Sequence, residues 1–203
     1  MSNELLAAAV IFWIAGGIIA LIGRGLPGAR ALLALGSLSG ILAAILVLPA
    51  GTGAVPLPTV LAGQLVEFRL APDALWLLGF GLVPAVIACW VGNPVAERNS
   101  SWLFGAALSL VGALGVFGLR QGAAFLISWE IMSLGGAAMI LGERLSPPGR
   151  PVLFMLALLE VGTIALTLGI ILLASPVQNL SFATFSSGAD ALPGHLRMQV
   201  SCS

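Results

Sequence analysis

The sequence predicts an all-α integral membrane protein with six transmembrane helices. Hydrophobic residues make up 59% of the 203 residues and charged residues only 8%, against roughly 25% charged residues in soluble domains. The mean hydropathy is +1.11. Six apolar runs follow one another, each close to the ~20 residues that cross the ~30 Å hydrocarbon layer of a bilayer. Together these observations exclude a soluble domain.

The expected spans cover residues 5–23, 31–48, 74–92, 102–119, 122–141 and 152–174. Prolines and glycines mark most breaks between them, since neither residue readily continues a helix. The longest internal loop, residues 49–73, is rich in both. Near its end the stretch VEFRLAPD (66–73) alternates apolar and polar residues, which predicts a short interfacial strand or turn.

Only Arg120 and Gln121 separate the fourth span from the fifth, so we expect these spans to form a helical hairpin. Gly105, Ser109 and Gly112 fall on one face of the fourth span. Small residues at such spacing allow two membrane helices to approach closely. This face is therefore expected to form a close helix contact.

The distribution of arginine predicts the orientation in the membrane. All eight basic residues are arginines. One side holds Arg24, Arg30, Arg98, Arg144 and Arg150, and the other holds Arg69, Arg120 and Arg197. Because arginine-rich loops stay in the cytoplasm, we expect the first side to be cytoplasmic and both termini to lie outside. The expected location is the cell inner (plasma) membrane, with the chain crossing it several times.

The fifth span, GAAFLISWEIMSLGGAAMIL, carries Glu130 inside an otherwise apolar segment. A carboxylate at this depth costs on the order of 2.5–3.5 kcal/mol on insertion scales. Such a residue faces protein or water, and its default interpretation is functional. Ser133 follows at i+3, on the same helix face. We interpret Glu130 as a proton-transfer residue.

The sixth span carries a second acid, Glu160, with Thr163 and Thr167 at i+3 and i+7. Hydroxyl groups can hydrogen-bond either a carboxylate or a neutral acid, so a carboxyl in such a stripe can load and release a proton. The two acids are expected at depths too different for a direct hydrogen bond, and one or two waters can bridge them. Glu160 is thus the second candidate proton-transfer residue.

Structural interpretations of these residues remain open. Glu130 also fits a permanently protonated acid that makes a hydrogen bond between helices, and Glu160 also fits a position facing a vestibule. Serine and threonine are common packing residues in membrane spans. Trp129, beside Glu130, is interpreted as core packing.

Other chemistry has no support in the sequence. The net charge of zero gives no electrostatic case for nucleic acid. Cys89 and Cys202 show neither a disulfide framework nor metal-ligand spacing. No phosphate-binding loop or nucleophile motif is present. We expect no catalytic residue, no cofactor and no bound metal in this chain.

The segment FLISWEIMSL (125–134) resembles the fifth helix of the antiporter-like membrane subunits of respiratory complex I, group 4 hydrogenases and multisubunit sodium/proton antiporters. The WEIMSL core carries the resemblance, supported by VEFRLAPDAL (66–75) and LEVGTIALTLGIILL (159–173). The large membrane subunit of hydrogenase-4 and formate hydrogenlyase is the branch it resembles most. The resemblance extends over essentially the whole chain and implies the amino-terminal part of the antiporter-like subunit fold.

By this resemblance, Glu130 matches a fifth-helix glutamate that modulates proton movement by pairing with a lysine on the seventh helix. The sequence departs from the family here, because it contains no lysine and no seventh span. An acid at Glu160 is also outside the family pattern. We therefore expect a six-helix bundle over residues 1–174 and a polar tail over 175–203. Either the chain is a copy truncated or frameshifted before a seventh helix, or another chain supplies the remaining helices.

The resulting hypothesis is a non-redox membrane subunit of a proton-translocating hydrogenase or NADH dehydrogenase-like complex, in which partner subunits hold the redox centres. Its expected partners are other membrane subunits and the lipid bilayer. One alternative is a structural membrane fragment without an ion path of its own. Another is a small stand-alone transporter built as an oligomer. The sequence leaves the coupling ion, H⁺ or Na⁺, open.

Overall fold

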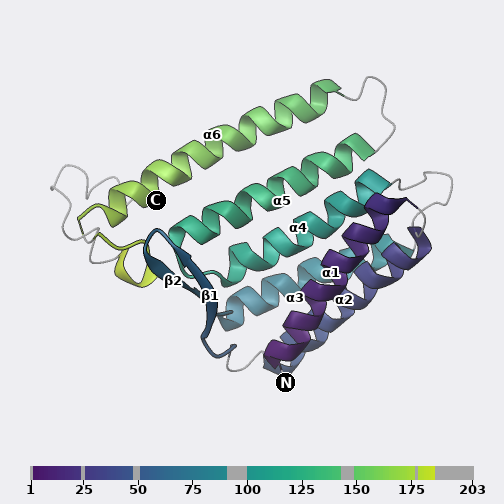
Figure 1. The fold of residues 1–203 in the computed structure, drawn as a ribbon, viewed down its shortest axis with the longest axis horizontal. Helices are drawn as coiled ribbons and strands as arrows, with labels where there is room; N and C mark the ends of the chain where they lie inside the picture. Colours follow the sequence, from purple (N-terminus) through teal and green to yellow (C-terminus); the bar gives the residue numbers. More distant parts are fainter. Residues whose placement is uncertain are drawn as a thin grey trace.

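The computed structural model describes residues 2–23, 26–47, 51–90, 100–142, 149–176 and 178–185 (Figure 1). Its long helices are α1 (Ser2–Ile22), α2 (Leu26–Val47), α3 (Pro72–Trp90), α4 (Ser100–Gly118), α5 (Gly122–Gly142) and α6 (Gly149–Ala174). Strands β1 (Val55–Leu61) and β2 (Gln64–Phe68) lie between α2 and α3, and a short 3-10 helix covers Phe182–Thr184. The six helices are long and apolar enough to cross a membrane. The all-α membrane fold predicted from the sequence is confirmed.

Part of the orientation prediction rests on residues that the structure does not describe. Arg24, Arg98, Arg144 and Arg197 lie outside the described ranges, as does the side chain of Arg150. The same holds for most of the predicted tail, residues 186–203. The orientation and the end of the chain therefore stay as the sequence predicts them.

The hydrophobic core lies where α1, α2, α3 and α4 meet, and includes Trp13, Leu33, Leu82 and Leu103 as fully buried side chains. The indole N–H of Trp13 donates to Ser37 Oγ of α2 at 3.3 Å. The ring lies against Gly36, where an added Cβ would come within 2.7 Å of it. Glycine at this position thus allows α1 and α2 to pack closely around the largest side chain of the core.

Helices α4 and α5 form the closest contact in the bundle, backbone against backbone. A Cβ on Gly105 would lie 2.6 Å from the carbonyl oxygen of Gly135. A Cβ on Gly112 would lie 2.5 Å from the amide nitrogen of Met132, and one on Gly135 equally close to that of Ser109. The close contact predicted for Gly105, Ser109 and Gly112 is confirmed, and its partner is α5.

Helix α6 lies at the edge of the bundle and packs mainly on α5 (Figure 1). Only 6% of its apolar window is buried, against at least 17% for each of the other membrane helices. Its outward face carries large exposed apolar side chains, among them Leu153, Leu158 and Ile164. The α5–α6 interface therefore buries little apolar surface. The polar contacts across it contribute a correspondingly larger share of the interaction between the two helices.

The hairpin pairs Val55 with Phe68 and Leu61 with Gln64. Its two-residue turn, Ala62–Gly63, has φ values of 50° and 77°, the positive values of a type I′ turn. Of the strand or turn predicted over residues 66–73, only residues 66–68 are strand, as the end of β2, and Pro72 already begins α3. Strand β1 was not predicted, because its prolines are typical of loops. An edge strand tolerates proline, since the absent N–H would point away from the sheet.

The α4–α5 connection lies between this hairpin and the segment that follows α6. On one side the amide of Arg69 donates to the carbonyl of Gly118 at 2.8 Å, and that of Arg120 to Glu67 at 3.0 Å. On the other side the amide of Gly122 donates to the carbonyl of Leu180 at 2.8 Å. Backbone polar groups between the spans are thereby paired, as a chain that enters the bilayer at this point requires.

A Gly135→Ala substitution tests the α4–α5 contact. Alanine is intrinsically the better helix former by about 1 kcal/mol. Here we nevertheless expect a loss of roughly 1–3 kcal/mol in unfolding free energy, because the new Cβ meets the α4 backbone and cannot be accommodated by side-chain movement.

Gly162→Ala on α6 is the matched control, since nothing lies within 4 Å of a Cβ at that position. It should be neutral or stabilising. Denaturant unfolding of the purified chain in detergent measures both variants, and equal stability of the two would contradict close backbone packing at Gly135.

Candidate functional site

The direction of Glu130 follows from the packing of α5 on α4. Ser128, Met132 and Gly135 of α5 contact α4 through its glycines. At ~100° per residue, Glu130 lies about 140–160° around the helix from each of them. Its side chain therefore leaves α5 on the side away from α4, where α6 packs, and it is half-buried there.

On α6 the partner of Glu130 is Thr163. The Thr163 hydroxyl donates to Glu130 Oε1 at 2.6 Å. Other side-chain hydrogen bonds between described spans, such as Trp13 to Ser37 and Ser39 to the carbonyl of Leu5, join neutral groups. The Glu130–Thr163 contact brings together two residues predicted from the sequence, and it places an ionisable group between two membrane helices.

Thr163 also has a second acceptor, the carbonyl oxygen of Leu159 one turn earlier, at 3.1 Å. A hydroxyl carries one proton but can both donate and accept. With Glu130 ionised, Thr163 donates to the carboxylate. With Glu130 protonated, the acid can donate to Thr163 Oγ1 while the Thr163 proton turns to Leu159. Both protonation states of Glu130 are thus satisfied by rotation of one hydroxyl.

Ser133 is placed differently from the other predicted polar neighbours. It is buried, and its hydroxyl donates to the carbonyl of Trp129 in its own helix at 2.9 Å. This back-bond to residue i−4 occupies the proton of the hydroxyl. Thr167 is half-buried on α6, one turn beyond Thr163. The structure shows no hydrogen bond from either residue to Glu130.

Glu160 is separated from this contact. It lies one turn before Thr163, about 4.5 Å along α6, and is exposed on the surface of the described bundle. Its carboxyl makes no hydrogen bond or ion pair within the part of the chain that the structure describes. The structure therefore brings Glu130 and Thr163 together and leaves Glu160 facing outward.

Trp129 has a feature that the sequence analysis did not anticipate. Its ring packs against Phe125, with ring centroids 6.2 Å apart, as the packing interpretation expected. Its indole nitrogen, however, is buried without a hydrogen-bond partner. A buried N–H beside the Glu130 position is a free donor for water or for a group from another chain. In the sequence, the only indication of such a role was that Trp129 directly precedes Glu130.

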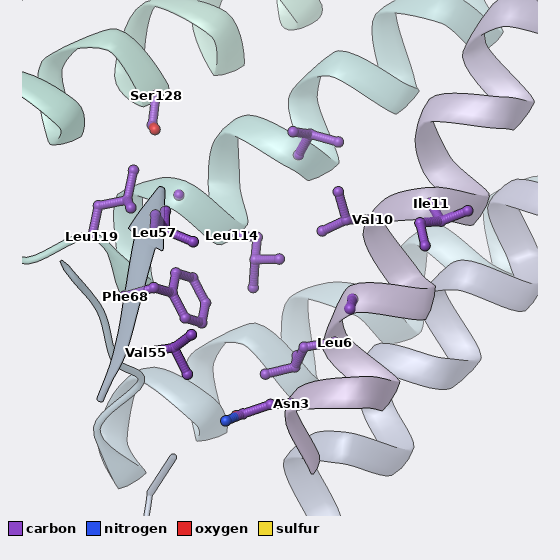
Figure 2. A pocket seen from close by; sticks show the side chains of 13 residues that line it. Asn3, Leu6, Val10, Ile11, Val55, Leu57, Phe68, Leu114, Leu119 and Ser128 are labelled. Atoms are coloured by element: carbon purple, nitrogen blue, oxygen red, sulfur yellow. The ribbon is translucent and has the colours of Figure 1, made fainter. Parts of the chain in front are cut away.

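An apolar cavity lies elsewhere, between α1, α4 and the hairpin (Figure 2). It has a volume of about 490 Å³, and Asn3 and Ser128 are the polar side chains in its lining. Figure 2 shows these two separated by apolar groups such as Phe68 and Leu114. The polar side chains in the lining form no continuous chain of hydrogen-bonding groups, and Glu130 is not among the lining residues.

Among the described residues, no three His, Cys, Asp or Glu side chains are grouped closely enough to hold a metal ion. The polar side chains that the structure brings together at the α5–α6 interface are the Glu130 carboxyl and the Thr163 hydroxyl. This pair can hold a proton, release it and relay it, provided that water or another polar group reaches Glu130.

The Glu130–Thr163 bond can be measured by a double-mutant cycle with Glu130→Ala and Thr163→Val. Hydrogen bonds between membrane helices couple by about 0.6 kcal/mol on average and at most about 1.7 kcal/mol. We expect a coupling free energy in that range from unfolding in mixed micelles, and Thr163→Ser should restore most of it because serine keeps the hydroxyl.

Thr167→Val provides the comparison, since Thr167 is also half-buried on α6 but makes no hydrogen bond to Glu130. Its cycle with Glu130→Ala should give no coupling. Equal coupling for the two threonines would contradict a specific bond at Thr163.

Comparison with solved structures supports the membrane fold described above. No protein-family model matches the sequence, and no curated protein matches it by sequence. Among solved structures, the chain is similar to a chain of the membrane-bound sulfane sulfur reductase, an archaeal respiratory membrane complex, with a TM-score of 0.74 and 22% identity. The match covers 92% of this chain and 30% of that chain. The chain therefore has the fold of one part of a respiratory-complex membrane protein.

Proposed function

We propose that the chain is a membrane subunit of a proton-translocating hydrogenase or NADH dehydrogenase-like complex, in which Glu130 carries a proton within the bilayer. The observation that supports this most directly is the Glu130–Thr163 hydrogen bond between two membrane helices. The similarity to a chain from a respiratory membrane complex supports the assembly. The WEIMSL segment favours the hydrogenase-4 and formate hydrogenlyase branch.

The hydroxyl of Thr163 explains how the proposed step proceeds at low cost. A proton that arrives at Glu130 neutralises the carboxylate, and the hydrogen bond then reverses its direction without movement of either helix. A proton that leaves restores the first arrangement. Each of the two states thus keeps a hydrogen bond between Glu130 and Thr163.

The other residues predicted from the sequence, Glu160, Ser133 and Thr167, have secondary roles in this proposal. Glu160, one turn from Thr163, is the next carboxyl along α6 and extends the pathway when another helix covers it. Ser133 and Thr167 are hydroxyls close in sequence to the two acids. The chain itself performs no redox chemistry in this proposal, because the electron carriers belong to partner subunits. Protons are proposed as the translocated ion, because the hydrogen bond between Glu130 and Thr163 accommodates a proton on the acid.

Glu130→Gln tests the proposal in the complex purified through a tag on this chain. Glutamine keeps the size and the hydrogen-bond acceptor but cannot exchange a proton. In proteoliposomes containing a pH-sensitive dye, we expect proton translocation per turnover to fall by at least roughly tenfold, while substrate oxidation continues in uncoupled vesicles. Glu130→Asp should retain part of the transport.

Glu67→Gln is the control, because Glu67 is an exposed acid of the hairpin at the membrane surface. It should leave transport unchanged. Unchanged proton translocation in the Glu130→Gln complex would reject the proposal and favour a structural hydrogen bond at this position.

A further inference from the structure

The outward face of α6 carries a regular seam of six residues. The seam comprises Leu153, Ala157, Glu160, Ile164, Thr167 and Ile171. All are exposed except Thr167, which is half-buried. Figure 1 shows α6 as the outermost helix, with α5 on one side. The seam is therefore available on the described bundle, along most of the length of α6.

The spacing of the seam is that of helix packing. Successive members are four, three, four, three and four residues apart, the heptad pattern that left-handed packing of one helix on another requires. From Leu153 to Ile171 the seam extends about 27 Å along the axis, nearly the ~30 Å hydrocarbon thickness. A single membrane-spanning helix would cover it from end to end.

Glu160 lies near the middle of this seam. Its carboxyl therefore determines which side chain a helix packed on the seam has to present there. An exposed carboxylate at mid-depth in lipid is costly, by on the order of 2.5–3.5 kcal/mol or more. The sequence contains no lysine. The arginine side chains that the structure describes, Arg30, Arg69 and Arg120, belong to a helix start and to loops. The described part of the chain therefore supplies no ion pair to Glu160.

A second copy of the chain does not meet this requirement. Two copies packed through the same seam would bring Glu160 against Glu160, and like charges repel most strongly where water is scarce. A basic side chain on a partner helix gives the opposite result, because it offsets the charge of Glu160 and fixes the register of the two helices.

We propose that the α6 seam is the docking surface for one transmembrane helix of a partner subunit, and that this helix presents a basic side chain to Glu160. The apolar members of the seam supply the close contacts, and the ion pair selects the partner and its depth. This inference does not rest on proton transfer by Glu130, since it concerns association alone.

The test uses the full 203-residue chain, labelled with a donor fluorophore and reconstituted in phosphatidylcholine vesicles. The probes are two acceptor-labelled leucine–alanine peptides that span the bilayer and differ only in a central lysine or leucine. We expect energy transfer to show association with the lysine peptide roughly tenfold tighter than with the leucine peptide. In the Glu160→Leu variant this difference should disappear.

Two tryptophan variants test the location of the contact. Ile164 lies in the seam, whereas Leu158 lies about 120° around α6 from it. Each is 58% exposed, so neither substitution disturbs the core. Ile164→Trp should weaken the binding of the lysine peptide, and Leu158→Trp should not. Circular dichroism of each variant verifies that the helices are intact.

Three results would overturn the inference. The first is equal affinity for the two peptides, and the second is equal behaviour of the two tryptophan variants. The third is Glu160-dependent self-association of the chain without peptide, which would make a second copy the occupant. Because proton transport is not measured, none of these results bears on the role of Glu130.

Discussion

The backbone contact between α4 and α5 is the constraint on which the rest of the arrangement depends. Gly105, Gly112 and Gly135 allow the two helices to approach until the backbone of one meets that of the other. This contact fixes the rotation of α5 about its axis. Since Glu130 lies about 140–160° from the residues that face α4, its side chain has to leave on the α6 side. A wider α4–α5 spacing would permit α5 to rotate and the acid to meet lipid.

The same pair of helices organises the surface at one end of the bundle. The short α4–α5 connection is bonded to the hairpin at Glu67 and Arg69 and to the segment after α6 at Leu180. The side chain of Gln121 donates to the carbonyl of Leu61 at 2.6 Å, which adds a second link to the hairpin. Backbone groups that no helix satisfies are thus paired with one another, so the ends of α4, α5 and α6 are held at a common level.

The two intramembrane acids differ in their burial and in their hydrogen bonding. Glu130 is half-buried between helices and has a hydroxyl partner, whereas Glu160 is exposed on a helix of which little is covered. Both are costly in hydrocarbon. The described bundle supplies a hydrogen-bond partner to Glu130 and none to Glu160. The exposed acid lies in the seam of α6 that is proposed above as a docking surface.

The sequence by itself determined the number and approximate limits of the membrane helices, because composition and run length suffice for a chain that has to hide its backbone from lipid. It also identified the face of α4 that carries small residues as a helix contact. In addition, it identified the two intramembrane acids as positions that are costly in hydrocarbon. It did not identify β1, whose prolines hid an edge strand, or the orphan indole N–H of Trp129. Only the tertiary structure decided that Thr163 meets Glu130 while Ser133 bonds its own helix and Glu160 faces outward. Helix periodicity places residues on a face, but which neighbour covers that face depends on backbone contacts between segments far apart in the chain.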